Sequence, residues 1–169
     1  NTDPSRDYAN TNFEVVEYGY KASTVPGTVS GLLQAHKNFG KLPLEEVLKP
    51  VIRQAKEGIR VSYDLEQAIG SSSQLKKDPE SRRIYFKDGS PIKEGSLMQR
   101  PDLAKTLSLI AENGDKAFYE GEIAKKFVLA MESNEGLITD DDLKNYKSRF
   151  STPIGINYRE QKVFTHGPP

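Results

Sequence analysis

Val25-Pro-Gly-Thr-Val-Ser-Gly31 is the most informative stretch of this chain, together with the run Gly40-Lys-Leu-Pro-Leu-Glu-Glu-Val-Leu-Lys-Pro50 that follows it. A proline and two glycines in the first stretch predict a tight turn. From Thr28 onward, apolar residues recur at the spacing of an amphipathic helix, and Gly40 supplies a stop for that helix. The two stretches therefore predict a turn that feeds a series of capped helices.

Composition indicates a globular domain with much surface in contact with water. The chain has 169 residues, 36% of them hydrophobic and 28% charged, and its mean hydropathy is −0.64. This length suits one domain with a sizeable core. The apolar share is low for such a domain, so we expect a peripheral helical layer or a piece of a larger molecule.

Charge and residue usage exclude several classes of function. Lys+Arg and Asp+Glu number 24 each, which draws the chain to neither nucleic acid nor an anionic membrane. Cysteine is absent, so disulfides and thiolate chemistry are excluded. No apolar run approaches the ~20 residues of a membrane span. The chain starts at Asn1 without a signal peptide and stops directly after an expected strand, so we expect neither end to be a natural terminus.

The pattern predicts an α+β chain that is mostly α-helical, as one piece with three parts. Residues 1–27 are expected to be irregular, with one short apolar alternation at Phe13–Val16. Residues 28–146 are expected to be helical with a small hairpin near 84–92, and residues 147–169 to form a β-ribbon.

Local signals set the expected helix boundaries. Pro50 does not fit unstrained in a helix interior, so we expect a break there and a new helix over Val51–Glu57. Ser62 is the expected N-cap of a helix over Tyr63–Leu75, and residues 70–83 are expected to hold its end and a loop.

Later in the chain, turn and cap signals are equally plain. Asp88-Gly89 predicts the tight turn of the hairpin. Pro101 is expected to open a helix that Gly114 stops. Arg159-Glu160 is expected at the turn of the C-terminal ribbon.

The chain has only two histidines, far apart in sequence. His36 falls on the apolar side or the edge of a predicted helix, and we interpret it as a partly buried structural residue. His166 follows a predicted strand, where a connection is the simpler interpretation and a site loop the alternative. Two distant histidines without cysteine predict no zinc cluster.

The triplet Asp140-Asp141-Asp142 resembles part of a calcium loop, but the Gly and terminal Glu of an EF-hand are missing at the required spacing. Thr139 before the triplet is a good N-cap, and acids stabilise the positive end of a helix. We therefore expect a capped short helix here.

Three further motifs are weak. Ser73-Gln-Leu-Lys76 matches S-x-x-K, but no S-D-N or K-T-G segment follows it. Pro26–Gly31 has glycines but lacks the lysine of a phosphate-binding loop. A small basic patch, formed by Lys76-Lys77 and Arg82-Arg83, is interpreted as a solvated surface. The residues therefore predict no catalytic, substrate-binding or metal-ligating position in this chain and no cofactor.

Six blocks of sequence resemble the γ-glutamyltransferase family, which includes cephalosporin acylase-like members, in the family's order across residues 19–169. The blocks are Gly19–Gly31, Phe39–Gly58, Gly95–Leu107, Gly114–Ala124, Gly136–Tyr146 and Tyr158–Pro169. Each block alone is a weak match, whereas six in order are specific.

The resemblance implies a piece of an αββα sandwich of the N-terminal-nucleophile hydrolases, with residues 147–169 leading into the sandwich. In that family one precursor cleaves itself into a large and a small subunit. The threonine that begins the small subunit is the nucleophile, and its own α-amine, with a pKa of about 8, accepts the hydroxyl proton. Such chemistry needs neither histidine nor cysteine.

The resemblance also implies what is missing from these residues. The family's nucleophile and γ-glutamyl pocket would follow Pro169, and its carboxylate-binding arginine would precede Asn1. No catalytic or substrate-binding role of the family transfers to a residue here, Thr2 included. The segment alone is therefore expected to be inactive, to wall the substrate cleft, and to bind the small catalytic subunit of its own precursor.

Several alternatives stay open. Within the family, the parent protein is either a γ-glutamyltransferase or hydrolase, or an acylase that cleaves β-lactam side chains. Outside the family, a helical interaction module without enzymatic activity fits the same composition. The resemblance suggests a periplasmic or secreted protein. If the ribbon at 154–165 lacked the rest of its sheet, it would show an open edge.

Overall fold

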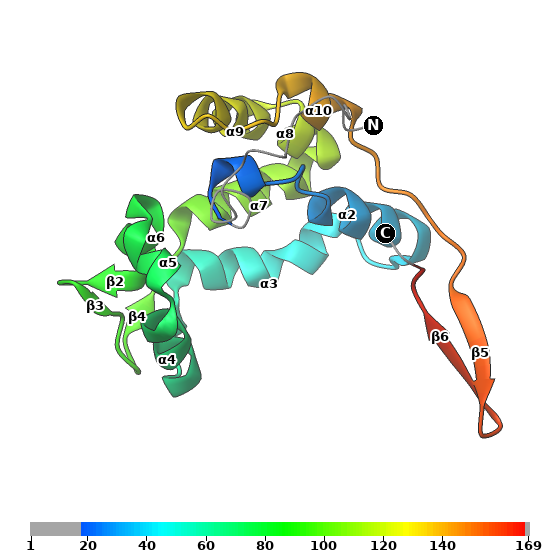
Figure 1. Ribbon diagram of the computed structural model, residues 1–169, viewed down its shortest axis with the longest axis horizontal. Coiled ribbons are helices and arrows are strands. Elements are labelled where there is room, and N and C mark those ends of the chain that lie inside the picture. Colours follow the sequence, from blue (N-terminus) through cyan, green and yellow to red (C-terminus); the bar gives the residue numbers. More distant parts are fainter. Residues whose placement is uncertain (1–17, 168–169) are drawn as a thin grey trace, which may run out of the picture. The chain divides into compact units, whose positions relative to one another are not determined.

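The structure is a computed structural model that describes residues 18–167, and its contacts divide the chain into two compact units. One unit contains Asn1–Phe39 and Tyr119–Pro169, and the other contains Gly40–Phe118 (Figure 1). The described residues are mostly helical with three small two-stranded sheets, which confirms the predicted α+β class. The apolar alternation at Phe13–Val16 lies outside the described residues, and the three-part division at 27 and 146 stays a prediction.

The first unit, called unit 1 below, combines helices with the C-terminal ribbon. Its elements are η2 (Tyr20–Ala22), α2 (Thr28–Phe39), the last residue of α8 (Asp115–Tyr119), α9 (Glu122–Ser133), α10 (Asp140–Asn145), β5 (Ile154–Tyr158) and β6 (Gln161–Thr165).

The second unit, called unit 2, is built on two long helices. Its elements are α3 (Leu44–Glu57), β1 (Ile59–Arg60), α4 (Tyr63–Ser71), α5 (Ser73–Lys77), α6 (Pro79–Tyr85), β2 (Phe86–Lys87), β3 (Ser90–Pro91), β4 (Leu97–Met98), α7 (Pro101–Asn113) and the rest of α8.

In unit 2, α3 lies beside α7 along most of its length (Figure 1). Ala55 of α3 and Ala104 and Ile110 of α7 are buried. The backbone N–H of Arg100 donates to the carbonyl of Ala55 at 2.8 Å, which joins the start of α7 to α3. The pair of helices is therefore the core on which the short helices and hairpins of this unit are built.

The predicted break at Pro50 is wrong, because α3 runs without interruption from Leu44 to Glu57 with Pro50 inside it. A proline inside a helix costs roughly 3 kcal/mol through the lost hydrogen bond and the ring clash. Leu48 and Ile52, on either side of the proline, are half-buried, whereas Pro50 itself is exposed. Packing of α3 along α7 therefore outweighs the local preference for a break.

Residues 70–83 were predicted to hold a helix end and a loop. The helix end is correct, because α4 ends at Ser71, but the loop is wrong, because the rest of the stretch forms α5 and most of α6. The Oγ atom of Ser72 accepts the N–H of Leu75, and the carboxylate of Asp78 accepts the N–H of Ser81 at 2.7 Å. The latter bond lowers the pKa of Asp78 below its ordinary value. Since each short helix has its own N-cap, the chain continues as separate helical turns.

Other local predictions are confirmed by their geometry. Ser62 caps α4 by accepting the N–H of Leu65 at 3.2 Å. Gly114 ends α7 with a φ of 64°, in the left-handed region that glycine tolerates. Asp88 and Gly89 also have positive φ, of 51° and 76°, and form the tight turn between β2 and β3. The first strand begins at Phe86, since Tyr85 still belongs to α6.

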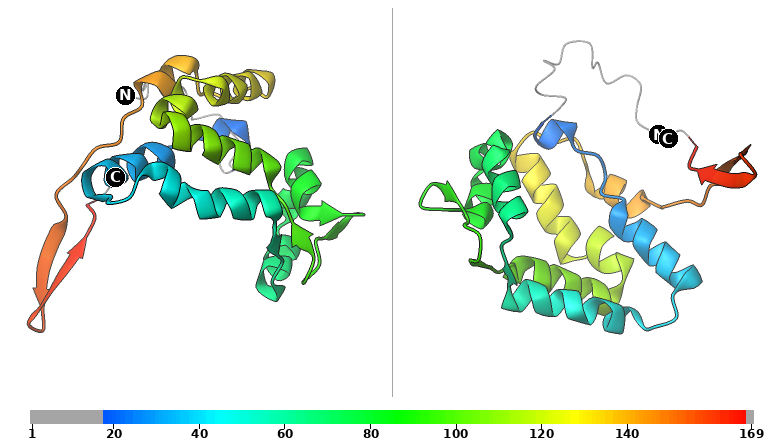
Figure 2. Two further views of the ribbon diagram at one scale, coloured as in Figure 1. Left: turned by 180° about the vertical axis from the view of Figure 1, so that it is seen from behind. Right: turned by 90° about the horizontal axis from the view of Figure 1, so that it is seen from below.

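The C-terminal ribbon pairs β5 and β6 in antiparallel register, with Ile156 opposite Val163, and all ten strand residues are exposed (Figure 2). Period-two alternation places Ile154, Ile156 and Tyr158 with Val163 on one face, which makes that face apolar. Among the described residues, β5 and β6 pair only with each other. No helix in residues 18–167 has the length and apolar content required to cross a membrane.

The turn of the ribbon is a site where a substitution should increase stability. Arg159 and Glu160 have φ of 45° and 66°, and a side chain in this left-handed region costs about 1–2 kcal/mol. Glu160→Gly removes that cost at one position, so we expect amide hydrogen exchange in β5 and β6 to slow several-fold. Gln161→Gly, one residue further inside a strand, is the matched control and should accelerate exchange. Equal effects of both variants would contradict this account.

A second prediction concerns the carboxylate of Glu66 in unit 2. It accepts the N–H of Glu94 at 2.7 Å and the Nζ of Lys93 at 2.9 Å, and these bonds lower the pKa of Glu66 from its ordinary 4.5. Because the folded pKa is depressed, the stabilisation is complete above the unfolded pKa and is lost as pH falls through the folded value. Urea unfolding should therefore show Glu66→Gln less stable than the parent at pH 7, and the difference should shrink as the pH falls below 4.5 and through the lowered pKa of Glu66.

The matched control for this prediction is Glu46→Gln, which removes only an exposed carboxylate 3.6 Å from Lys49. It should change the free energy of unfolding little at any pH. A pH-independent loss in Glu66→Gln would show that the carboxylate charge is not the stabilising feature.

Candidate functional site

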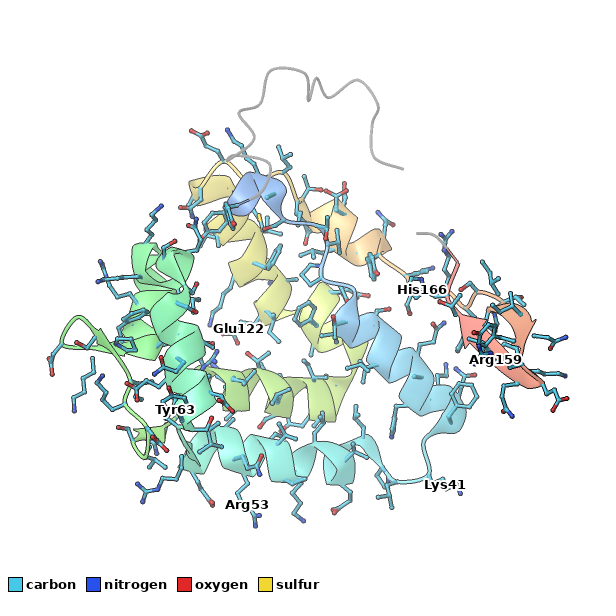
Figure 3. All side chains as sticks on the ribbon, turned by 60° about the horizontal axis from the view of Figure 1, so that its bottom comes forward. Lys41, Arg53, Tyr63, Glu122, Arg159 and His166 are labelled. Atoms are coloured by element: carbon cyan, nitrogen blue, oxygen red, sulfur yellow. The ribbon has the colours of Figure 1, made fainter. Side chains whose placement is uncertain are left out.

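The two histidines lie on different elements of unit 1. His36 is half-buried on α2, and His166 is exposed directly after β6, where its Nδ1 donates to the carbonyl of Gly167 at 2.7 Å. In Figure 3, His166 lies at the end of the ribbon opposite the turn that carries Arg159. The printed contact of His166 is thus a backbone carbonyl and not the carboxylate that orients a general base.

The aspartate triplet forms the start of α10. The carboxylate of Asp142 accepts the N–H of Thr139 at 2.9 Å, while the hydroxyl of Thr139 accepts the N–H of Asp142 at 3.2 Å, which is a reciprocal capping box. Asp140 forms an ion pair with Lys144 one turn later and raises the pKa of that lysine. Residues 18–167 contain no cluster of three potential metal ligands, and the capping prediction is confirmed.

Two of the weak motifs, Ser73–Lys76 and the basic patch, lie in unit 2. Ser73 and Lys76 are both exposed on the short helix α5. In the basic patch, Arg83 forms ion pairs with Glu80 at 3.0 Å and Asp102 at 3.2 Å. These carboxylates raise the pKa of Arg83 and neutralise part of the patch.

The stretch Val25–Gly31 takes part in a group of contacts that we call the turn cluster, which is formed by Pro26, Gly27, Ser30, Tyr119 and Tyr146. The Tyr119 side chain is only 5% exposed, and its hydroxyl donates to the carbonyl of Pro26 at 2.6 Å. The same hydroxyl accepts the N–H of Ser30 at 3.1 Å. Tyr119 thus satisfies a donor in the first turn of α2, which begins at Thr28.

Tyr146 completes the turn cluster. Its ring stacks on Tyr119 with centroids 5.8 Å apart and planes 18° apart. A Cβ atom on Gly27 would lie 2.9 Å from Cζ of Tyr146 and still closer to the hydroxyl oxygen. Gly27 is therefore required by close approach of the tyrosine.

A polar chain continues from the turn cluster. The hydroxyl of Ser30 donates to Oγ of Ser148 at 2.9 Å, and Ser148 in turn donates to Oε1 of Gln34 at 2.9 Å. The backbone N–H of Ser148 donates back to Ser30 at 3.2 Å. These bonds join α2 to the segment that leads into the ribbon.

The turn cluster and the hydrogen bonds of Ser30, Ser148 and Gln34 stabilise the fold of unit 1. They lack the features of a site that activates a nucleophile. An activated serine needs a base within hydrogen-bond reach, whereas this chain of hydroxyls ends at the amide of Gln34. Tyr119, Tyr146 and Ser148 were missed by sequence reasoning, since no local pattern links residues about 90 to 120 positions apart in the chain. The absence of a catalytic, substrate-binding or metal residue remains a prediction.

Comparison with known proteins gives the family. The family model for gamma-glutamyltranspeptidase matches residues 4–169. The chain therefore belongs to the γ-glutamyltranspeptidase family.

Individual relatives agree with this assignment. A glutathione hydrolase proenzyme of Escherichia coli is 39% identical over 150 residues, which cover 88% of this chain and 26% of that protein. An acylase ACY 1 proenzyme of a Pseudomonas species is 36% identical over 152 residues, covering 89% of this chain and 27% of that protein. The chain thus spans about a quarter of the length of these relatives.

The fold agrees as well. The crystal structure of Helicobacter pylori gamma-glutamyltranspeptidase superposes with a TM-score of 0.90 and 32% identity, covering 96% of this chain and 47% of that chain. The predicted fold class, a mostly helical piece of an N-terminal-nucleophile hydrolase sandwich, is thereby confirmed.

The close approach at Gly27 gives a prediction. Gly27→Ala should lower the free energy of unfolding by about 1–3 kcal/mol, because the added methyl group meets the Tyr146 ring. Tyr146→Phe removes the nearest atom, so the double variant should recover part of that loss. Chemical denaturation of the single and double variants measures this coupling.

The matched control is Gly31→Ala in the first turns of α2, four residues further along the chain, where a Cβ meets nothing within 4 Å. Alanine is favoured over glycine in a helix by up to about 1 kcal/mol, so this variant should be at least as stable as the parent. Additive losses in the Gly27/Tyr146 pair would contradict the proposed contact.

Proposed function

We propose that these residues are part of the large subunit of an enzyme that transfers or hydrolyses γ-glutamyl groups. The substrates would be glutathione-type γ-glutamyl amides, with water or an amine as acceptor. The observation that carries the proposal is the family match over residues 4–169. The glutathione hydrolase proenzyme of E. coli, at 39% identity, supports this class of substrate.

The proposed reaction has two steps. The hydroxyl of the small subunit's first threonine attacks the γ-carbonyl of the substrate, its proton passes to the α-amine of the same residue, and the leaving amine takes up a proton. The resulting ester is then cleaved by water or an acceptor amine, which regenerates the threonine. Residues 1–169 supply neither the threonine nor its amine in this proposal, so this segment alone is inactive.

The partner in this proposal is the small catalytic subunit cut from the same precursor. The description of the E. coli relative as a proenzyme supports a processed precursor. The matched part makes up 26% of that proenzyme but 47% of the H. pylori crystal chain, as is expected when a solved chain holds one product of a divided precursor.

In this proposal the segment itself forms part of the wall of the substrate cleft and holds α2 and the ribbon in place. The hydrogen bonds of Ser148 to Ser30 and Gln34 support this role, because they hold the start of the ribbon segment against α2. The ribbon would then extend the sheet of the sandwich through its exposed strand edges.

A second candidate is an acylase that cleaves amide side chains of β-lactams. The acylase ACY 1 proenzyme supports it at 36% identity, close to the 39% of the glutathione hydrolase. The two candidates share the nucleophile and differ in the pocket that binds the acyl group. In both proposals this pocket lies outside residues 1–169.

Activity measurements on the full-length precursor separate these candidates. We expect a precursor that splits into two polypeptides in denaturing electrophoresis and then releases p-nitroaniline from γ-glutamyl-p-nitroanilide. The 169-residue chain alone should show no turnover. Cleavage of a glutaryl or adipyl β-lactam amide without γ-glutamyl turnover would favour the acylase, and turnover by the isolated segment would overturn the proposed division of roles.

A further inference from the structure

Helix α2 differs from the other long helix of unit 1 in its charge. Its twelve residues, Thr28–Phe39, contain Lys37 as the single Asp, Glu, Lys or Arg. Helix α9 has the same length and carries four such residues: Glu122, Lys125, Lys126 and Glu132. A helix that presents a face to water normally carries charged residues on it, so the composition of α2 is that of a helix covered on both sides.

The side of α2 that faces the turn cluster is already covered. Val29, Ser30, Leu33 and Gln34 are half-buried there, and Ser30 and Gln34 make the hydrogen bonds to Tyr119 and Ser148 described above. This packing accounts for one side of the helix.

The opposite side of α2 is apolar and exposed. Leu32, Ala35 and Phe39 recur at i, i+3 and i+7 and therefore share one face. Leu32 is 66% exposed and Phe39 is 74% exposed. Phe150, itself exposed, packs edge-on against Phe39 with ring centroids 6.3 Å apart, which extends this surface onto the segment before the ribbon.

We propose that this outer face of α2, formed by Leu32, Ala35, Phe39 and Phe150, is buried against an uncharged, apolar surface of the remaining polypeptide of the same precursor. The inference rests on the proposed function in that a longer precursor supplies the partner. Two arguments identify this partner over a second copy of the chain.

The first argument is length. The matched part makes up 26% of the E. coli proenzyme, so most of such a polypeptide lies outside these residues and has to pack on them. The second argument is the ribbon, which follows Phe150 in the chain and exposes a further apolar face on β5 and β6. A single large domain can cover both the outer face of α2 and the apolar face of the ribbon, because the layers of a sandwich bury such faces against one another.

Cysteine labelling of the full-length precursor tests the burial, because residues 1–169 contain no cysteine. Leu32→Cys and Leu129→Cys are a matched pair, since Leu129 of α9 is 62% exposed in this structure, against 66% for Leu32. With other cysteines replaced, we expect maleimide to react at least tenfold more slowly with Leu32→Cys than with Leu129→Cys. In urea both variants should react at the same rate, and Ala35→Cys serves as a second probe if Leu32→Cys does not fold. Equal native rates for the outer-face and Leu129 variants would overturn the proposal.

A photo-crosslink identifies the partner. p-Benzoylphenylalanine in place of Phe39 preserves an aromatic side chain, and illumination of the processed protein should give adducts that map outside residues 1–169. Adducts to a second copy, or to residues 40–118 of the same chain, would overturn the assignment of the partner.

The γ-glutamyl anilide assay on the same samples keeps the two proposals apart. Protection of Leu32→Cys in a protein without γ-glutamyl turnover would leave the docking surface standing and the proposed function refuted. γ-Glutamyl turnover by a protein in which Leu32→Cys reacts as fast as Leu129→Cys would support the proposed function and refute the docking surface.

Discussion

The hydroxyl of Tyr119 is the contact on which the rest of unit 1 depends. It donates to the carbonyl of Pro26 and accepts the N–H of Ser30, so one buried group satisfies a carbonyl before α2 and a donor within its first turn. Leaving either backbone group buried without a partner costs about 1–3 kcal/mol. The entry into α2 is thereby fixed by a residue 89 positions further along the chain than Ser30.

The position of Tyr119 also constrains the path of the chain toward the C-terminal ribbon. The Tyr119 ring stacks on Tyr146, and Gly27 has to lack a side chain for Tyr146 to fit. Two residues after Tyr146, Ser148 bonds to α2 through Ser30 and Gln34. The path of the chain after α10 therefore follows from the geometry at the start of α2, and the ribbon begins from a segment held at several points.

The sequence predicted what short-range chemistry decides and missed what packing decides. Ser62, Gly114 and Thr139 act through neighbours within a few residues, and their capping roles were readable. Pro50 was misjudged because the packing of α3 on α7 outweighs a local break. Tyr119 and Ser148 left no signal, since a tyrosine or a serine is compatible with many environments and the partners of these two residues are distant in sequence. The same limit explains why the family was recognised from six blocks while the turn cluster within them was not.

Helix α2 carries little charge for a helix with an exposed outer face. A helix with one charged residue in twelve, held on one side by hydroxyls and aromatic rings, gains little from facing water on the other side. The hydroxyl of Ser30 in α2 donates to Ser148, which donates to the amide oxygen of Gln34, so this chain of hydroxyls holds no base that would activate a nucleophile. In the proposed γ-glutamyl-transferring enzyme, the contribution of this segment is geometry: the turn cluster fixes the start of α2 and the segment before the ribbon, and the outer face of α2 is the surface that we propose to meet the polypeptide that carries the chemistry.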